Sequence, residues 1–225
     1  MDEAIESTHF AAERVAAALR REVTEGALGA DERLKDNDLA ERFGVSRNTA
    51  REALRLVASE GLVVLRRHTG AAVRSLTLAD VHDIYRVRRT VECSAVLDSH
   101  RAAEHLFDAT SAAVTAAEKC VERRAWHEAV TASLDVHIAL VALGESERLA
   151  HFFAQQLAQL RIAFWALPIE TDVQEGWIAR DREIVDLVLG GKRDKAALEL
   201  RQYLDDSEAR LVDALRAQGR AARGH

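Results

Sequence analysis

The sequence predicts a mainly α-helical protein, with an N-terminal winged helix-turn-helix followed by an antiparallel all-helical bundle. Three observations support this fold class. Ala, Leu, Arg and Glu dominate the 225 residues, and a single proline and 11 glycines leave few breaks in helical runs. Residues 36–59 show a short helix, a tight turn and a second helix, and two short strand patterns follow. From residue 78 onward the pattern is helical almost throughout, with six helices expected.

Composition narrows the class of protein further. With 48% hydrophobic and 30% charged residues, the chain is expected to be globular and long enough for two modest domains. No apolar run approaches the roughly 20 residues of a membrane span and no signal peptide opens the chain, so a cytoplasmic location is expected. Cys93 and Cys120 lie in helical patterns without metal-type spacing and are interpreted as reduced core thiols.

The first part of the N-terminal domain should be two helices. The first is expected at residues 7–24, where apolar residues recur with helical spacing before Gly26 and Gly29 end it. Asp36 is placed to cap a short second helix that continues through Phe43.

A third helix from Ser46 to about Ser59 carries the strongest functional signal. At about 100° per residue, one side collects small and apolar residues, namely Ala50, Ala53, Leu54 and Val57. The opposite side collects Arg47, Asn48, Arg51 and Arg55. Guanidinium groups at this spacing suit a helix that enters the DNA major groove, with Ser46 as its N-cap. An ordinary amphipathic helix with a solvated Arg face is the alternative that periodicity alone leaves open.

The charge distribution favours the DNA-binding interpretation. The chain has a net charge of −6, which argues against indiscriminate binding to nucleic acid. Residues 42–74 nevertheless carry seven Arg against two Glu, while the segments on either side are both acidic. One basic segment in an acidic chain is typical of a localised phosphate-binding surface.

The basic segment ends in a predicted β-hairpin. Strands are expected at residues 62–67 and 71–74, joined by a tip at 68–70. With Arg66, Arg67 and His68 at or beside the tip, this hairpin could reach a minor groove or touch phosphates. A plain solvent-exposed hairpin is the weaker alternative, because the hairpin directly follows the Arg-bearing helix.

Residues 15–74 resemble the DNA-binding domain of the GntR family of bacterial transcriptional regulators. The resemblance is carried in order by Leu39-Ala-Glu-Arg-Phe-Gly-Val-Ser-Arg47, Arg51-Glu-Ala-Leu54, Glu60-Gly-Leu-Val63 and Gly70-Ala-Ala-Val73. The sequence departs from the family pattern at Thr49, where Pro is usual, and at Asn37, where some members have Arg. These departures suggest an operator sequence that differs from the family's usual one.

The resemblance and the helix pattern together nominate the residues that contact DNA. Arg47 and Arg51 are the main candidates for base or phosphate contacts. The remaining candidates are Ser46, Asn48 and Thr49 on the helix and Arg66, His68 and Gly70 on the wing. A homodimer that places two such helices in successive major grooves of a near-palindromic, double-stranded operator is expected.

The second half of the chain is predicted to be a bundle. We expect the winged domain to span residues 1–75 and a helical effector-binding and dimerisation domain to span residues 76–225. Thr77 and Asp80 make a capping-box-like start. The six helices are predicted at 78–105, 108–124, 126–143, 146–167, 174–190 and 193–218.

The opening of this bundle, Val81 to Glu92, resembles that of the FadR-type C-terminal domain known as FCD, in its shorter six-helix version. Arg88 four residues before Glu92 matches the usual pattern. The resemblance implies a small organic acid bound inside the bundle, often with a divalent metal, and a domain that dimerises.

The positions that would hold this metal depart from the pattern. The family's usual ligands are an Asp, a His four residues later and two further His; the corresponding residues here are Ser133, His137, Asp181 and Tyr203. A single imidazole among these groups is a poor ligand set for a transition metal, so we expect a metal-free pocket and no cofactor. A weakly held divalent ion between His137 and Asp181 is the alternative.

The expected effector site combines these residues with two cations. Arg88 or Arg161 could supply charge to a carboxylate, and Ser133, His137, Asp181 and Tyr203 could supply hydrogen bonds. His137 taken alone is equally consistent with a hydrogen-bonded core histidine.

The sequence supports three classes of function to different degrees. The leading one is a transcriptional regulator, a repressor in the commoner case, that is controlled by an organic acid or related metabolite. A constitutive DNA-binding dimer whose bundle has lost its ligand is the alternative. An enzyme is not expected, because no nucleophile–base set is present.

Overall fold

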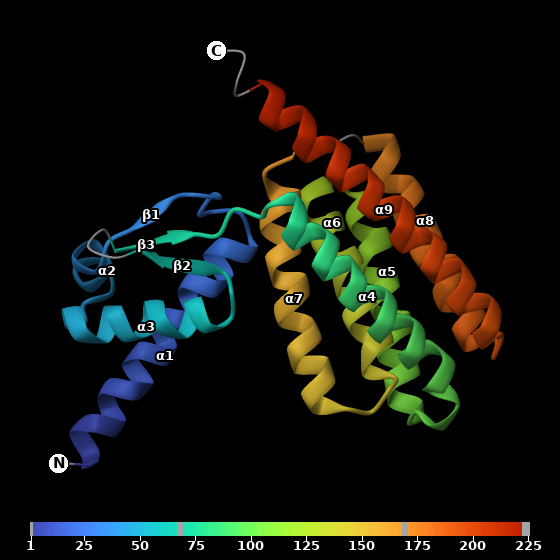
Figure 1. Ribbon diagram of the computed structural model, residues 1–225. Coiled ribbons are helices and arrows are strands. Elements are labelled where there is room, and N and C mark those ends of the chain that lie inside the picture. The colour runs from blue at the N-terminus through green and yellow to red at the C-terminus, as the bar shows by residue number, and fades with distance from the viewer. Residues whose placement is uncertain (1, 67–69, 168–170, 222–225) are drawn as a thin grey trace. The chain divides into compact units, whose positions relative to one another are not determined.

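The computed structural model describes residues 2–66, 70–167 and 171–221. Figure 1 shows a small sheet with helices beside it, and a set of long helices. Contacts divide the chain into two compact units. The first comprises Met1–Leu76 with Ala158–Ala166, and the second comprises Thr77–Leu157 with Leu167–His225.

The N-terminal unit is a winged helix-turn-helix. Its elements are, in order, α1 (Asp2–Thr24), β1 (Arg33–Leu34), α2 (Asp36–Phe43), α3 (Arg47–Ser59), β2 (Val63–Arg66) and β3 (Gly70–Val73). The strands form an antiparallel sheet in the order β1-β3-β2. The predicted hairpin is thus present, whereas β1 was not predicted, because two residues are too few to show strand alternation.

The turn between α2 and α3 forms as its residues predict. Gly44 follows α2 with φ 63°, a left-handed conformation that glycine adopts without a steric penalty. Ser46 then caps α3, and its side chain accepts a hydrogen bond from the backbone N–H of Thr49 at 3.1 Å. This cap satisfies one of the free amides at the start of α3 and fixes where the helix begins.

The start of α2 differs from the prediction. The N-cap residue is Lys35, which makes no side-chain cap, and Asp36 is the first residue inside the helix. The expected Asp36 cap was therefore wrong. The physical reason is that the Asp36 carboxylate is used elsewhere, in contacts with Arg47 and Arg51.

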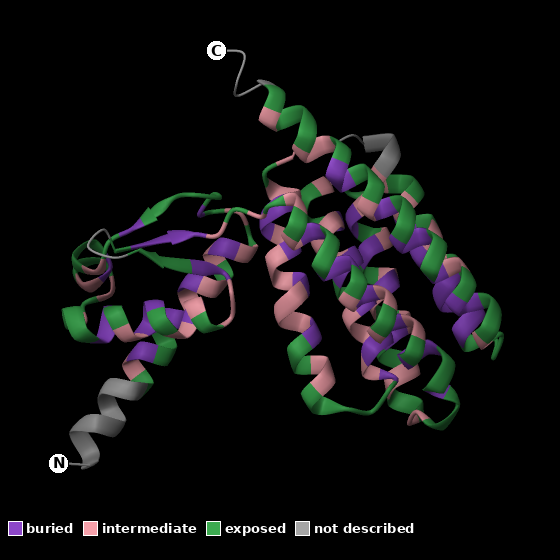
Figure 2. Ribbon diagram, in the orientation of Figure 1, coloured by how far each residue is buried: buried purple, intermediate pink, exposed green. Residues whose placement is uncertain are grey.

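The apolar face of α3 packs into the core of this unit. Figure 2 shows buried residues along the inner side of α1 and α3. The buried set includes every residue predicted for that face together with partners on α1, α2 and the sheet: Val15, Leu19, Val23, Leu39, Ala50, Ala53, Leu54, Val57, Leu62 and Val73. Burying this face leaves the opposite, Arg-bearing face of α3 exposed.

The second unit is all-helical in its described residues. Its helices are α4 (Leu78–Asp98), α5 (Glu104–Glu122), α6 (Trp126–Ala142), α7 (Glu147–Trp165), α8 (Thr171–Leu189) and α9 (Arg193–Ala221). The end of α7, from Ala158 onward, is grouped with the first unit. The start of α4 is a capping box, in which Thr77 and Asp80 each bond the other's backbone N–H, as predicted.

One helix boundary was misplaced. The predicted break at residues 107–108 lies instead at 102–103, after a short 3-10 turn at Ser99–Arg101. No glycine or proline marks this break. Ser99 is fully buried there, its hydroxyl donates to the Val96 carbonyl, and Arg193 Nε donates to that hydroxyl. Packing against α9 thus coincides with the end of α4, a signal absent from the local sequence.

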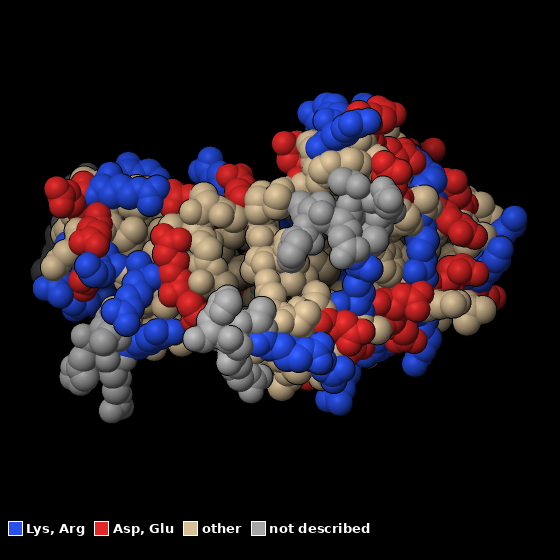
Figure 3. All heavy atoms as spheres, turned by 90° about the horizontal axis from the view of Figure 1, so that it is seen from above, with Lys and Arg blue, Asp and Glu red and all other residues tan. Residues whose placement is uncertain are grey.

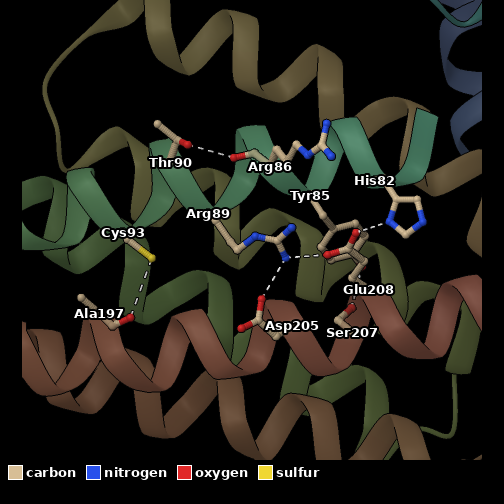
Figure 4. A network of polar contacts seen from close by, with 10 residues as sticks. All are labelled: His82, Tyr85, Arg86, Arg89, Thr90, Cys93, Ala197, Asp205, Ser207 and Glu208. Carbon is tan, nitrogen blue, oxygen red and sulfur yellow. Dashed lines mark hydrogen bonds and ion pairs between the residues drawn. The ribbon is translucent and has the colours of Figure 1, made fainter. Parts of the chain in front are cut away.

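The two longest helices of the second unit, α4 and α9, are joined by polar contacts along their length (Figure 4). Glu208 accepts hydrogen bonds from His82 Nδ1 and from Arg89 Nη1, both at 2.6 Å. Arg89 also reaches Asp205, and the Cys93 thiol faces the Ala197 carbonyl at 3.8 Å. These contacts fix the register of α4 against α9. The buried polar residues Arg88, on α4, and Tyr203, on α9, are positioned by these two helices.

Both cysteines are free thiols, with Cys120 buried and Cys93 half-buried. Among the described residues, no helix is long and apolar enough to cross a membrane.

Candidate functional site

The exposed face of α3 presents the predicted DNA-contacting residues near its N-terminus. Ser46, Arg47, Asn48 and Arg51 are all exposed. Arg47 and Arg51 are one helical turn apart, so their guanidinium groups extend from the same side of the helix. This face can meet a phosphate with its first amides and base edges with its guanidinium groups.

A carboxylate holds both guanidinium groups. Asp36 Oδ2 accepts from Arg47 Nε at 3.0 Å and from Arg51 Nη2 at 2.8 Å. These hydrogen bonds, that of Arg47 first, hold the pKa of Asp36 below its usual value, so the carboxylate stays ionised. Since a guanidinium has five N–H donors, both arginines retain donors that can bind DNA while one edge of each is oriented by Asp36.

Two other candidates on α3 contact each other. The Ser46 and Thr49 hydroxyls lie 2.8 Å apart, and Thr49 is only 4% exposed. Thr49 therefore helps to build the start of the helix. A contact between its hydroxyl and DNA stays a prediction.

The wing is defined by Arg66 and Gly70, which pair across the end of the hairpin. Arg66 is exposed and its Nη2 lies 3.3 Å from Asp31 Oδ1. Gly70 has φ 88°, and a Cβ there would lie 2.9 Å from the Leu34 carbonyl oxygen, so this close approach to β1 requires glycine. His68 and Arg67 lie outside the described residues.

Surface charge is mixed rather than of one sign. On the face drawn in Figure 3, Lys and Arg side chains alternate with Asp and Glu side chains. Part of the positive charge on α3 is balanced by Asp36, which pairs with Arg47 and Arg51.

A second cluster of predicted residues lies inside the helical unit. Five of the six effector candidates are buried there: Arg88 on α4, Ser133 and His137 on α6, Asp181 on α8 and Tyr203 on α9. Helices far apart in sequence thus bring these polar side chains into one core. The sixth candidate, Arg161, lies on α7 in residues 158–166, which group with the N-terminal unit.

The cluster is connected by a continuous series of polar contacts. Arg88 Nε donates to Glu92 Oε1 at 2.7 Å, and Glu92 Oε2 lies 2.6 Å from His137 Nδ1. Because a carboxylate oxygen accepts, Nδ1 of His137 carries the proton of this bond. On the other side of the ring, His137 Nε2 faces Asp181 Oδ1 at 3.5 Å. Glu92 was recognised in the sequence as part of a motif but was not predicted as a site residue.

Hydroxyl groups complete the series. Ser133 Oγ donates to Asp181 Oδ2 at 2.6 Å, and the Tyr203 hydroxyl lies 3.3 Å from Ser133 Oγ. Burial and the Asp181 carboxylate raise the pKa of Tyr203 well above its usual value, so its hydroxyl keeps its proton. The two hydroxyls therefore act as donors toward the Asp181 side of the cluster.

The charges of the cluster stabilise one another. Burial raises the pKa of Glu92, but the charges of Arg88 and His137 outweigh burial and lower it overall. Burial likewise lowers the pKa of His137, yet the Glu92 and Asp181 carboxylates raise it overall. The site thus holds ionised groups in the bundle core, where isolated charges would be unstable.

Three polar atoms of this cluster stay without a hydrogen-bond partner among the described residues. They are Arg88 Nη2, His137 Nε2 and Asp181 Oδ1, each on a side chain that is 1% exposed. Buried donors and acceptors are almost always paired in native proteins, because an unpaired one costs about 1–3 kcal/mol. Two of the three, His137 Nε2 and Asp181 Oδ1, face each other as an ion pair at 3.5 Å, and the third, Arg88 Nη2, is a buried donor that a polar ligand could satisfy.

Aromatic rings border the cluster. Tyr203 lies 4.9 Å from the His137 ring and 4.8 Å from Trp177, in each case between ring centroids. Arg180 is placed over both Trp177 and Tyr203. No residue type or spacing in the sequence links Trp177 to this site.

The residues present do not fit the divalent metal that the sequence resemblance implied. His137 and Asp181 could each give one donor atom, but Ser133 and Tyr203 are protonated hydroxyls, which are weak metal ligands. Among the described residues, no group of three or more His, Cys, Asp or Glu is arranged to hold a metal ion. Arg88 already supplies a fixed positive charge in the same network. That the protein uses no metal stays a prediction.

Both parts of the chain match models of known protein families. Residues 11–73 match the model of the bacterial regulatory proteins of the GntR family, and residues 83–206 match that of the FCD domain. The second match alone covers more than half of the chain and includes every residue of the buried cluster.

Curated relatives resemble about a third of the chain. The gluconate operon transcriptional repressor of Bacillus licheniformis is 42% identical over 79 residues, which is 35% of this chain and 32% of the relative. An HTH-type transcriptional regulator of Bacillus subtilis, YdhC, is 38% identical over 78 residues, 35% of each chain. The chain thus aligns with only about a third of the length of these relatives.

Solved structures resemble the chain over most of its length. A transcriptional regulator GntR from Rhodococcus sp. RHA1 is 28% identical with a TM-score of 0.84, over 90% of this chain and 98% of that one. McbR/YncC of E. coli, at 17% identity, shares the fold with a TM-score of 0.77 over 90% of this chain and 97% of that one. The chain belongs to the GntR family of bacterial regulatory proteins and carries an FCD domain behind its winged helix-turn-helix.

Proposed function

We propose that this protein is a sequence-specific DNA-binding transcriptional regulator, acting as a repressor, whose operator affinity is controlled by a small organic acid or related metabolite in the helical domain. The observation that carries the proposal is the exposed N-terminus of α3. There Ser46 caps the helix and Asp36 orients Arg47 and Arg51. The similarity to gluconate operon repressors over 79 residues supports the repressor role.

On DNA, α3 enters the major groove. Arg47 and Arg51 read base edges or grip phosphates, and Ser46, Asn48 and Thr49 assist at the helix start. Arg66, His68 and Gly70 bring the wing against the adjacent backbone. A homodimer places two such units on a near-palindromic site, because a two-fold axis in the protein requires matching half-sites.

The helical domain acts as the sensor. Effector candidates Arg88, Ser133, His137, Asp181 and Tyr203 meet in the bundle core, where Arg88 Nη2 is buried without a hydrogen-bond partner among the described residues. This unpaired buried donor favours a ligand-binding domain over a bundle that only dimerises. Arg161 remains a proposed effector contact that rests on the sequence alone.

Selection of bound DNA from a random pool tests the DNA-binding function. The purified full-length chain should enrich a motif with two related half-sites whose centres lie about one helical turn, roughly 10 base pairs, apart. An added effector should then change affinity for that motif. Enrichment of no sequence over the starting pool would overturn the assignment.

A further inference from the structure

One side of α5 stays open in the described part of the chain. The helix packs against α6 and α8 through its buried residues, among them Val114 and Ala117. The other side is exposed or half-buried, and small residues in its middle leave a hollow of about 390 Å³. At about 100° per residue, the residues that line this hollow share one face of the helix: Asp108, Ser111, Ala112, Thr115, Ala116 and Lys119.

The two ends of this face carry opposite charges. Asp108 lies at its N-terminal end and Lys119 at its C-terminal end, and both side chains are exposed. In the part of the chain that the structure describes, neither side chain takes part in an ion pair or a hydrogen bond. A surface that is negative at one end and positive at the other fits a second surface with the same pattern in the reverse direction.

A two-fold axis through the centre of the hollow brings such a reversed surface into place. In an antiparallel pair of α5 helices centred midway between Asp108 and Lys119, Asp108 lies opposite the partner's Lys119. The two-fold symmetry repeats this pairing, so each copy gives one carboxylate and one ammonium group. A parallel pair would instead place like charges against each other, which disfavours that arrangement.

The complementary pattern continues beyond the hollow. In the same antiparallel pair, exposed Glu104 lies opposite the partner's Arg123, and exposed His105 lies opposite the partner's Glu122. Arg123 meets Glu128 of its own chain at 3.4 Å, with both side chains about two-thirds exposed. Because an exposed pair of this kind contributes little to stability, it leaves Arg123 available to the second copy.

The small residues allow the two helices to approach closely. Ser111, Ala112, Thr115 and Ala116 of one copy meet the same four residues of the other, which places the helix axes near the lower end of the usual range of about 8–10 Å. One edge of the face is already fixed in the single chain. Arg182 of α8 donates to Thr115 at 3.0 Å and to Glu118 at 2.7 Å, so less side-chain entropy is lost on association.

We propose that this face of α5 is the surface through which two copies of the chain associate, as an antiparallel helix pair around a two-fold axis. A second copy fits better than an unrelated partner, because the charge pattern is complementary to itself. The inference rests on the proposed function, in which a homodimer binds the operator, and it names the surface that forms this dimer.

Exchange of the charges tests the pairing by sedimentation equilibrium of the full-length chain at low salt without DNA. Wild type should be a dimer. Asp108→Lys and Lys119→Asp should each raise the dimer dissociation constant at least about tenfold, because each places two like-charged pairs across the axis. The double exchange should return the constant to within about threefold of wild type. Glu183→Lys, at an exposed position on α8, makes the same charge change elsewhere and should leave the constant unchanged.

A second variant tests the close approach of the helices without relying on the charges at the ends. Ala112→Arg fills the hollow with a long side chain and should also raise the dissociation constant at least about tenfold. Leu198→Arg on α9 changes an apolar side chain that is 65% exposed and should leave the dimer intact. Circular dichroism confirms that each variant keeps the helical spectrum.

Four results would overturn the proposal. They are a monomeric wild type, single charge variants that associate as tightly as wild type, a double exchange that does not restore association, and a dimer that Leu198→Arg disrupts but Ala112→Arg does not. Selection of DNA from the random pool is carried out separately on wild type. A chain that selects an operator but dimerises through another face fails only this inference. A chain that forms this dimer but selects no sequence fails the regulator function.

Discussion

Arg51 Nη2 lies 2.8 Å from Asp36 Oδ2, so a residue at the start of α2 orients a guanidinium on the recognition helix. The same oxygen accepts from Arg47. Ion pairs on a protein surface contribute little to stability, typically about 0–1 kcal/mol, so the main consequence of this one is geometric. It restricts the Arg47 and Arg51 side chains before DNA binds, so less side-chain conformational entropy is lost on binding.

Replacement of Asp36 by Ala should therefore separate affinity from specificity. Loss of a negative charge beside the phosphate-binding face should strengthen binding to random DNA. Loss of the shared acceptor should lower the ratio of operator to random-DNA affinity by about tenfold. Fluorescence anisotropy with operator and scrambled duplexes at several salt concentrations measures both quantities. Asp38→Ala, on the same helix and paired only with Lys35 among the described ion pairs, is the matched control. An unchanged ratio in Asp36→Ala would argue that the pair has no role in recognition.

The wing should be sensitive to a single methyl group at Gly70. A Cβ there would lie 2.9 Å from the Leu34 carbonyl oxygen at φ 88°, so Gly70→Ala should lower the free energy of unfolding by about 1–3 kcal/mol. Gly29→Ala is the control, because no atom lies within 4 Å of its added Cβ. Urea denaturation followed by circular dichroism compares the two. Equal stability of the two variants would show that β1 and the wing are not tightly paired in solution.

The buried pair of Arg88 and Glu92 should be costly to break. Glu92→Ala leaves the guanidinium in the bundle core without its main acceptor, which should destabilise the protein by about 3–5 kcal/mol. Glu183→Ala at an exposed site on α8 should change stability by less than about 0.5 kcal/mol. Thermal and urea unfolding provide the comparison. A loss below about 1 kcal/mol in Glu92→Ala would mean that water reaches this cluster freely.

The contact between α4 and α9 makes stability depend on pH. Burial raises the pKa of Glu208, but the hydrogen bonds from His82 and Arg89 outweigh burial and lower it overall below 4.5. A carboxyl whose folded pKa is depressed stabilises the fold above its unfolded pKa, and this contribution is lost as the pH falls through the folded value. Glu208→Gln should therefore cost about 0.5–1 kcal/mol at pH 7, and the difference from wild type should shrink below about pH 4.

Unfolding in urea across this pH range checks the Glu208 effect. Asp205→Asn, which removes a more exposed partner of Arg89, should have a smaller effect at pH 7. A difference between wild type and Glu208→Gln that grows as the pH falls would contradict the assigned sign.

The winged domain could be predicted from sequence because its signals are local. The spacing of Arg47 and Arg51, the cap at Ser46 and the glycine at position 44 each determine structure within one or two turns. The Asp36 cap was mispredicted because its carboxylate instead binds side chains 11 and 15 residues away. Local capping rules cannot register such a competition between helices.

The buried cluster could be predicted only in part. Ser133, His137, Asp181 and Tyr203 were nominated from positions matched to a family pattern, and the structure brings them together with Arg88. Glu92 was not nominated, although its position one turn after Arg88 on α4 was visible. Its function follows from a contact with His137 on another helix, which depends on how the helices pack. The arrangement of six helices in a bundle is not encoded in the periodicity of any one of them.

Operator binding by Arg51→Ala, set beside wild type, tests the central claim most directly. The duplex is the one selected from the random pool, and a scrambled duplex and the circular dichroism spectrum serve as controls for charge and folding. The account predicts that Arg51→Ala, and likewise Arg47→Ala, keeps the helical spectrum and loses specific operator binding, with affinity falling to that for scrambled DNA. Retention of sequence-specific binding in both variants would contradict the assignment of α3 as the recognition helix.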